Sequence, residues 1–242
     1  MSKTGKTIAA VSIVLAAIIG FGIYWLASNL DSLVAGAIEK VGGEVTGVPV
    51  RVSGVSISLK EGTGEIRGLT IGNPEGFNSD YALRLNSIRM TLDTSTITSN
   101  PLRIKKISVD GSELVAEVSV GSGINLARIY DNLNGGGDGG QPSSGESAGP
   151  KLVIEQFDFT HAAMTVKTPV SQDKSHKLGD VHVRNIGEGS GGATPAQVAV
   201  QLLRPVLREA VTAAREEAGN LGVEGYKQGA MDKLRDKLGI GK

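Results

Sequence analysis

The chain has 242 residues, with 25 lysines and arginines against 25 aspartates and glutamates, and it contains no cysteine. This length allows one or two domains, and the balanced charge gives no reason to expect a nucleic-acid-binding protein. The lack of cysteine excludes disulfides, cysteine-ligated metals and thiol nucleophiles. Glycine is frequent, with 34 residues, and only 4% of residues are aromatic, a composition that favours turns and β-structure.

The N-terminal residues 1–28 predict a short tail followed by a transmembrane anchor. Residues 8–27 are twenty positions without a charge, which is about the length that a helix needs to cross the hydrocarbon core. Lys3 and Lys6 precede this segment and Asp31 follows it. The positive-inside rule therefore places the tail in the cytoplasm and the rest of the chain across the membrane.

A cleaved signal peptide is the alternative for the same segment. Such a peptide has a shorter apolar region, with a cleavage site of small residues directly after it. The nearest such site, Ala35-Gly36-Ala37, lies well beyond Trp25. We therefore expect an uncleaved signal anchor. An amphipathic helix over residues 29–43 follows it, and Gly42-Gly43 is expected to end that helix.

From residue 44 the pattern changes to short alternating runs separated by glycine, asparagine, proline and aspartate, which is typical of β-strands. Residues 44–133 are expected to form the first part of a sheet, and residues 151–192 its continuation. Between them, residues 134–150 are rich in glycine and serine and predict a flexible linker. The GGGDGG of this linker lacks the lysine and the serine or threonine of a phosphate-binding loop.

The C-terminal residues 193–242 are expected to be helical. Thr194 is a candidate N-cap, Pro195 suits the first turn and Gln197 completes a capping box. An apolar stripe then runs through the helix, in which Pro205 predicts a kink. The basic end of this segment fits two interpretations: a helix that touches a membrane surface, or a solvated helix end that packs on its own domain.

One apolar pattern recurs along the predicted strands. The stretches 104–111 (IKKISVDG) and 154–161 (IEQFDFTH) both show an apolar residue, two polar ones, then apolar–polar–apolar. Residues i and i+3 of a regular strand face opposite ways, so a repeated phase shift implies a bulge or bend. Six matches occur, which begin at Val52, Ile66, Leu85, Ile104, Ile154 and Leu178. They predict a curled antiparallel β-sheet, and ordinary strands with chance phase slips are the alternative.

The chain resembles the N-terminal region of AsmA-like proteins over roughly residues 5–130, and more loosely over residues 151–186. The signature of that family falls on Gly47, Pro49, Val50, Val52, Leu69, Ile71, Gly72, Asn73, Pro74 and Gly76. The resemblance implies a curled sheet with an apolar groove, as in chorein-type lipid bridges. It also implies a single-pass protein of the Gram-negative inner membrane, with its bulk in the periplasm, that handles phospholipid or supports outer-membrane biogenesis and integrity.

The chain is short for such a role. Adjacent strands lie about 4.8 Å apart, so about ten of them would form a groove of roughly 50 Å. That length is small for a bridge between two membranes. A shortened accessory protein, an oligomer and a partner of another envelope machine all remain compatible with it.

No constellation of residues predicts an enzyme. The histidines are His161, His176 and His182, and no two of them have the helical spacing of a zinc site. The one G-x-S-x-G sequence, at residues 145–149 (GESAG), lies in the predicted flexible linker, whereas the motif of a nucleophilic serine needs a tight turn between a strand and a helix. We therefore nominate no catalytic residue, no metal ligand and no cofactor.

Two hypotheses follow for the function. The first is a membrane-anchored lipid-binding groove, with phospholipid and membrane as partners and with other envelope proteins or a second copy as further candidates. The second is a non-enzymatic structural or interaction subunit whose groove is closed by its own C-terminal helix. The candidate lipid-binding residues are Val55, Ile57, Leu69, Ile71, Ile88, Met90, Ile107, Val109, Phe157 and Phe159.

Overall fold

The computed structural model describes residues 29–119, 121–135, 150–169 and 171–220. The expected anchor, nearly all of the glycine-rich linker and the basic C-terminal segment lie outside these residues. Within the described part, no helix is both long enough and apolar enough to cross a membrane.

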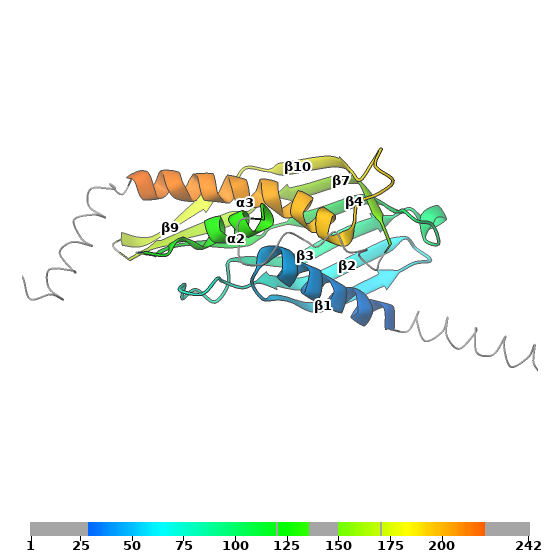
Figure 1. Cartoon of the computed structure of the whole chain (residues 1–242), viewed down its shortest axis with the longest axis horizontal. Helices are drawn as coiled ribbons and strands as arrows, with labels where there is room; N and C mark the ends of the chain where they lie inside the picture. Colours follow the sequence, from blue (N-terminus) through cyan, green and yellow to red (C-terminus); the bar gives the residue numbers. More distant parts are fainter. Residues whose placement is uncertain (1–28, 120, 136–149, 170, 221–242) are drawn as a thin grey trace, which may run out of the picture.

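In the described residues, ten strands and several helical segments form a mainly β-fold (Figure 1). The strands are β1 (Val50–Ser58), β2 (Thr63–Ile71), β3 (Leu83–Leu92), β4 (Leu102–Asp110), β5 (Glu113–Ser119), β6 (Gly123–Ile124), β7 (Leu152–Thr160), β8 (Ala163–Thr168), β9 (Ser171–Lys177) and β10 (Val181–Ile186). The helical segments are residues 29–46, the short 3-10 helix η1 (Thr94–Thr96), α2 (Asn125–Leu133) and α3 (Pro195–Asn220).

The strand order in the sheet is β10-β7-β4-β3-β5-β8-β9, and β2 also pairs with β3, β1 with β2 and β6 with β5. This order arises because consecutive strands join into long bent strands. Strand β3 pairs with β4 at Ile88 opposite Val109 and, in the same register, with β5 at Leu83 opposite Leu114. Strands β4 and β5 therefore behave as one strand bent between them. Strands β7 and β8 form a second bent strand in the same way. Strands β9 and β10 form a third, in which β10 pairs with β7 and β9 pairs with β8.

The two stretches that share the apolar pattern lie side by side in the sheet. Strands β4 and β7 pair with Ile104 opposite Ile154, and strands β5 and β8 pair with Leu114 opposite Met164. Both pairings keep a constant offset of fifty residues along the bent strand. The resemblance between residues 104–111 and 154–161 thus reflects two neighbouring strands that bend at the same place.

The sheet is mixed, so the expectation of a purely antiparallel sheet is wrong. Strands β4 and β7 are parallel, as are β5 and β8, whereas β1–β2, β2–β3, β3–β4, β7–β10 and β8–β9 are antiparallel. The reason is the connection between β5 and β7. It runs through β6, α2 and residues 134–150, and a crossover of that length returns the chain to its starting direction.

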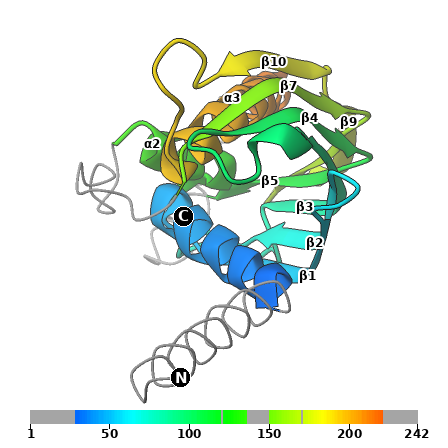
Figure 2. The ribbon, with the colours of Figure 1, turned by 90° about the vertical axis from the view of Figure 1, so that its right-hand side faces the viewer.

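The expected bends are present, and they curl the sheet. Gly111 and His161 have positive φ angles of 68° and 52° at the two aligned corners, and Gly68 bends β2 with a φ of 60°. Opposite β3, Lys105 is an extra residue, because Thr91 pairs with Lys106 and the next pair joins Leu92 to Ile104. Figure 2 shows the resulting sheet, which curls from β1 round to β10 without closing.

The bends place the apolar residues of all six pattern matches on one face. Each of these residues belongs to the hydrophobic core or packs against it. In a straight strand, the residues at i and i+3 would point to opposite faces. The phase shift therefore keeps the concave face continuously apolar.

Helices cover this concave face (Figure 2). Residues 29–46 lie against the β1–β2 part of the sheet, while α2 and α3 lie against the remainder (Figure 1). The expected capping box is confirmed, since the N–H of Thr194 donates to Gln197 Oε1 at 2.9 Å and the N–H of Gln197 donates to Thr194 Oγ1 at 3.3 Å. From Pro195, α3 continues through Pro205 as one helix.

The first helix does not end at Gly42-Gly43 as expected, but continues to Thr46. The Thr46 hydroxyl donates to the Gly42 carbonyl at 2.6 Å, which holds the last turn together. The same helix protects the edge of the sheet. Its Glu39 and Asp31 carboxylates accept the backbone N–H groups of Val52 at 2.8 Å and of Ile57 at 3.0 Å. These bonds occupy donors that an incoming strand would otherwise use.

Candidate functional site

The fold brings the ten candidate lipid-binding residues together on the concave face. They come from β1, β2, β3, β4 and β7 and belong to one apolar cluster or pack against it. Ile57 and Met90 are half-buried, at one end of the sheet, and the other eight are buried. The sequence pattern therefore identifies residues that share one face.

The same cluster contains the apolar stripe of α3. Val206, Leu207, Ala210 and Ala214 expose at most 2% of their surface, and they belong to one core with Ile107 and Phe157. Helix α2 adds Leu126 and Ile129, which are equally buried. In this state the concave face is thus filled by side chains of the chain's own helices.

A surface cavity of about 510 Å³ lies elsewhere, where β5, β8 and β9 meet the loop before β3. Glu117, Lys167 and Asp173 are its charged lining residues. Both Glu117 carboxylate oxygens accept backbone N–H groups, from Asn78 at 2.9 Å and from Ser79 at 2.7 Å. Burial raises the pKa of Glu117, but the hydrogen bonds from Ser79 and Asn78 outweigh it and lower the pKa below its ordinary value. Glu117 therefore holds the loop in place.

The signature that carries the family resemblance has structural roles. The Asn73 side chain donates to the Ser79 carbonyl at 2.5 Å and accepts from Asn125 Nδ2 at 2.6 Å. The N–H of Gly72 donates to the Pro49 carbonyl at 2.8 Å, and a Cβ at Gly72 would lie 3.2 Å from that oxygen. These contacts fasten the chain beyond β2 to β1 and to α2.

Asn125 is the buried centre of this arrangement. It is fully buried and begins α2. Its Nδ2 also donates to the Val115 carbonyl at 2.8 Å, while its Oδ1 accepts the N–H groups of Glu117 at 2.9 Å and Leu126 at 2.7 Å. All four bonds are made inside the protein, which fixes the start of α2 against β5.

Polar side chains cross the convex face in rows. Asp158 on β7 accepts hydrogen bonds from Lys106 on β4 at 2.9 Å, from Gln156 at 2.7 Å, and lies 2.8 Å from Nδ1 of His182 on β10. The hydrogen bonds from His182 and then Lys106 lower the pKa of Asp158 to about 2. The cluster joins three neighbouring strands.

Acid is expected to weaken this cluster. The pKa of Asp158 is lower in the folded chain than the value near 3.9 in an unfolded one, so its carboxylate stabilises the fold above that value. This contribution is lost as the pH falls from about 4 to about 2. Asp158→Asn should therefore be less stable than the unchanged chain at pH 7 and lose part of the acid dependence in urea unfolding. Asp173→Asn, on exposed β9, is the matched control. Equal pH profiles for both variants would contradict the assignment.

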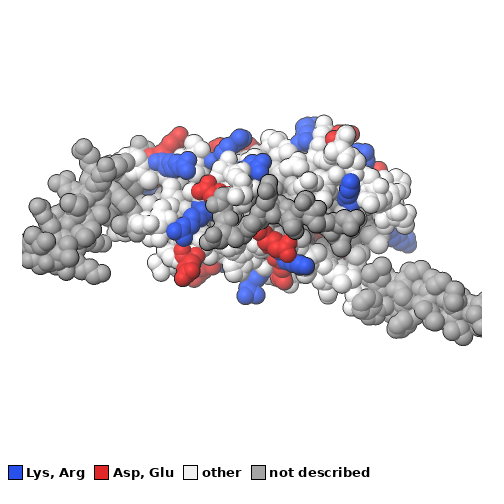
Figure 3. All heavy atoms as spheres, in the orientation of Figure 1, with Lys and Arg blue, Asp and Glu red and all other residues white. Residues whose placement is uncertain are grey.

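The three histidines are dispersed. His161, at the β7–β8 corner, places its Nδ1 2.7 Å from Asp110 Oδ1, and the hydrogen bond and charge of Asp110 raise the pKa of His161. His176 is exposed on β9, and His182 belongs to the Asp158 cluster. Within the described ranges, no group of three or more acidic or histidine side chains is placed to hold a metal ion. Figure 3 shows basic and acidic side chains interspersed over one face of the molecule.

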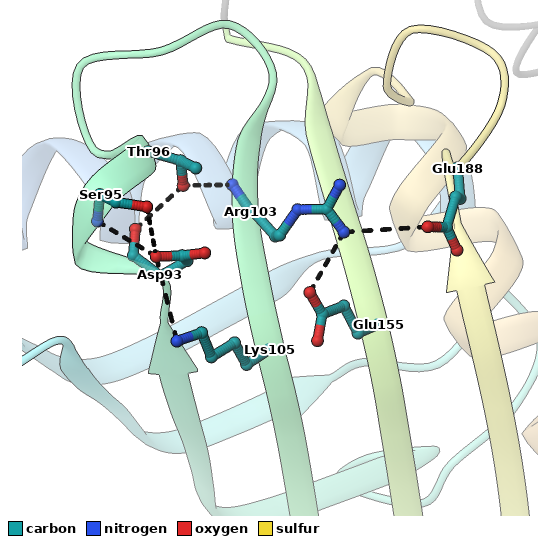
Figure 4. A network of polar contacts seen from close by, with 7 residues as sticks. All are labelled: Asp93, Ser95, Thr96, Arg103, Lys105, Glu155 and Glu188. Carbon is teal, nitrogen blue, oxygen red and sulfur yellow. Dashed lines mark hydrogen bonds and ion pairs between the residues drawn. The ribbon is translucent and has the colours of Figure 1, made fainter.

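A further network braces the end of the sheet where β3 finishes (Figure 4). Arg103 Nη1 lies 3.1 Å from Glu155 Oε1 and 3.9 Å from Glu188 Oε1, so it joins β4 to β7 and to the loop after β10. Asp93 accepts hydrogen bonds from the N–H and hydroxyl of Ser95 at 3.1 and 2.7 Å. Lys105 lies 3.9 Å from the same carboxylate. These contacts hold η1 against β4.

Comparison of the chain with family models, with curated proteins and with solved structures gave no match. The fold of the described residues defines the class by itself: a curled, unclosed, mixed β-sheet whose concave apolar face is covered by helices.

Proposed function

We propose that this chain is a membrane-anchored envelope protein that acts as a non-enzymatic structural or interaction subunit, with the interior of its curled sheet closed by its own helices. The observation that carries the proposal is the shared burial of the predicted groove residues and the α3 stripe in one core. The uncharged residues 8–27 and the lysines before them support an inner-membrane anchor with the bulk of the chain in the periplasm.

Close packing favours this function over an open lipid groove. A lipid chain needs vacant apolar volume, whereas protein cores are packed about as densely as organic crystals. Phe157 and Val109 expose only 5% and 2% of their surface, and Leu207 of α3 exposes 1%. A lipid at this position would have to displace α3 from the sheet.

Phospholipid handling is the second candidate, with α3 as a displaceable cover. Helix α3 is the last element of the described chain and takes no part in the strand pairing. Part of its buried stripe consists of Ala210, Ala213 and Ala214, which bury little area each. Since the hydrophobic contribution scales with buried apolar area, such a helix detaches at lower cost than a leucine-rich one.

The lipid content of the purified protein tests the two functions against each other. The full chain, extracted in mild detergent, should carry less than equimolar phospholipid by quantitative mass spectrometry. The variant Val206→Ala/Leu207→Ala, which loosens α3, should carry no more than the unchanged chain if the interior is closed. Gln201→Ala, on the exposed face of α3, is the matched control.

Equimolar phospholipid in the unchanged chain, with a further rise in the loosened variant, would contradict the closed interior and establish the lipid carrier. Circular dichroism must show that both variants keep the fold. Charged substitutions of Ile107 or Phe157 are unsuitable for this test, because both side chains are buried and a charge there would unfold the sheet.

A further inference from the structure

Two large apolar side chains of the described residues are exposed, and both lie at the same end of the molecule. Leu33 exposes 47% of its surface and Leu59 exposes 39%. Leu33 follows Asp31 by two residues, and Leu59 follows Ile57 by two. The hydrogen bond of 3.0 Å from the Ile57 N–H to the Asp31 carboxylate joins these two positions of the chain.

The same end is where the described chain begins. The described part of the first helix begins at residue 29, and the twenty uncharged residues 8–27 lie just before it in the sequence. Figure 1 shows the first described residues of this helix, in dark blue, beside the β1–β2 end of the sheet and far from β9. The exposed leucines are therefore placed next to the segment proposed to cross the membrane.

The turn that carries Leu59 is held firmly. Gly62 has a φ of 66°, and its carbonyl accepts the N–H of Leu92 at 2.8 Å. A Cβ at Gly62 would lie 2.7 Å from the Thr94 side chain, so the turn packs closely against the start of η1. The Asp93 and Arg103 contacts brace the adjoining strands (Figure 4). The turn thus presents Leu59 and the exposed Lys60 from a rigid support.

We propose that residues 59–62 and the first turns of helix 29–46 form a membrane-docking surface, whose partner is the surface of the bilayer that residues 8–27 cross. This inference rests on the membrane anchor of the proposed function. Leucines enter the boundary between headgroups and acyl chains, while a lysine keeps its ammonium group among the phosphates.

A bilayer fits this surface better than a protein partner does. A stable protein interface buries roughly 1,200–2,000 Å² in total, and a patch built on two leucines offers far less. A bilayer surface needs no matching partner patch, and the anchor keeps it at a high effective concentration. The docking surface is therefore expected to be bound to the bilayer even if the contact itself is weak.

Site-directed spin labelling tests the docking surface, and the cysteine-free chain makes every introduced cysteine unique. The full chain would carry a nitroxide at Leu59→Cys, at Leu33→Cys or, as the matched control, at Ser175→Cys on exposed β9. The proteins would be reconstituted in vesicles of phosphatidylcholine and phosphatidylglycerol. The readout is collision with membrane-soluble oxygen against collision with a water-soluble nickel chelate.

The expected result is a strong preference for oxygen at positions 59 and 33, corresponding to a depth of about 5–10 Å, with the control accessible to nickel. If the chain floats with the vesicles but all three labels are equally accessible to nickel, the docking surface is wrong and the anchor stands. If the labels at 33 and 59 are shielded from both reagents, a protein contact covers them and the proposal is overturned. If the chain does not float with the vesicles, both the anchor and the docking surface are wrong.

Discussion

Replacing Val206 with aspartate is expected to destabilise the protein by about 5 kcal/mol, enough to unfold most of it. Val206 exposes 2% of its surface between α3 and the sheet. Burial of this kind raises a carboxyl pKa by about 3–5 units, and each unit corresponds to about 1.4 kcal/mol. Typical domains are stable by only about 5–15 kcal/mol. Urea unfolding of the full chain in mild detergent, followed by circular dichroism, measures the loss.

The matched control is Gln201→Asp, which places the same carboxylate on the exposed face of α3. It is expected to change the free energy of unfolding by about 0.5 kcal/mol or less. If Val206→Asp is as stable as this control, α3 does not pack on the concave face in solution. The closed interior, and with it the proposed function, would then be wrong.

Replacing Asn125 with leucine is expected to cost about 4 kcal/mol, although leucine is more hydrophobic and similar in size. The substitution leaves the Val115 carbonyl and the Glu117 N–H without a hydrogen-bond partner. Two more groups that bond to Asn125 in the unchanged chain lose their partner as well. A buried group left without its hydrogen bond costs about 1–3 kcal/mol. Relaxation and water entry recover part of the total.

The exposed Asn134, just beyond the other end of α2, provides the control. Its side chain donates one hydrogen bond, to the Tyr130 carbonyl at 2.9 Å, so Asn134→Leu should cost less than about 1 kcal/mol. Urea midpoints of the two variants, measured side by side, give the comparison. Equal midpoints would mean that Asn125 is not the buried centre that fastens α2 to β5 and Asn73.

The curl of the sheet could be predicted because a bend in a strand changes the spacing of its apolar residues. Each match places apolar side chains at i, i+3 and i+5, and only a bent strand puts all three on one face. Whether two neighbouring strands are parallel or antiparallel does not change this spacing. Residues 104–111 and 154–161 would show the same pattern in a parallel or an antiparallel pair, and α2, which decides between them, was not anticipated.

Two elements were missed for different reasons. Helix α2 did carry a signal, since Leu126, Ile129 and Leu133 have helical spacing, but the sequence analysis assigned residues 44–133 as a whole to the sheet. Strand β9 carried none. Its sequence, SQDKSHK, has no large apolar residue, because this edge strand is exposed over its described side chains and gains its place from pairing with β8.

The shared face of the candidate residues could be predicted from the sequence, but what covers that face could not. Apolar periodicity shows which residues share a face, and the ten candidate residues do share one. It does not show what covers that face. The α3 stripe and the groove residues are equally apolar, and only the fold shows that they pack on each other rather than on separate partners.

The offset of fifty residues between the two bent strands sets an order for assembly during synthesis. Strands β1, β2 and β3 are neighbours in sequence and pair as soon as about residue 92 has emerged. The β4–β5 strand finds its second neighbour only after the whole crossover and β7 have followed, and such distant pairing is slow. Of the described elements, helix α3 is synthesised last. Until then the nascent concave face lacks this cover, so a chaperone or a lipid would find its widest access during synthesis, before α3 packs on the sheet.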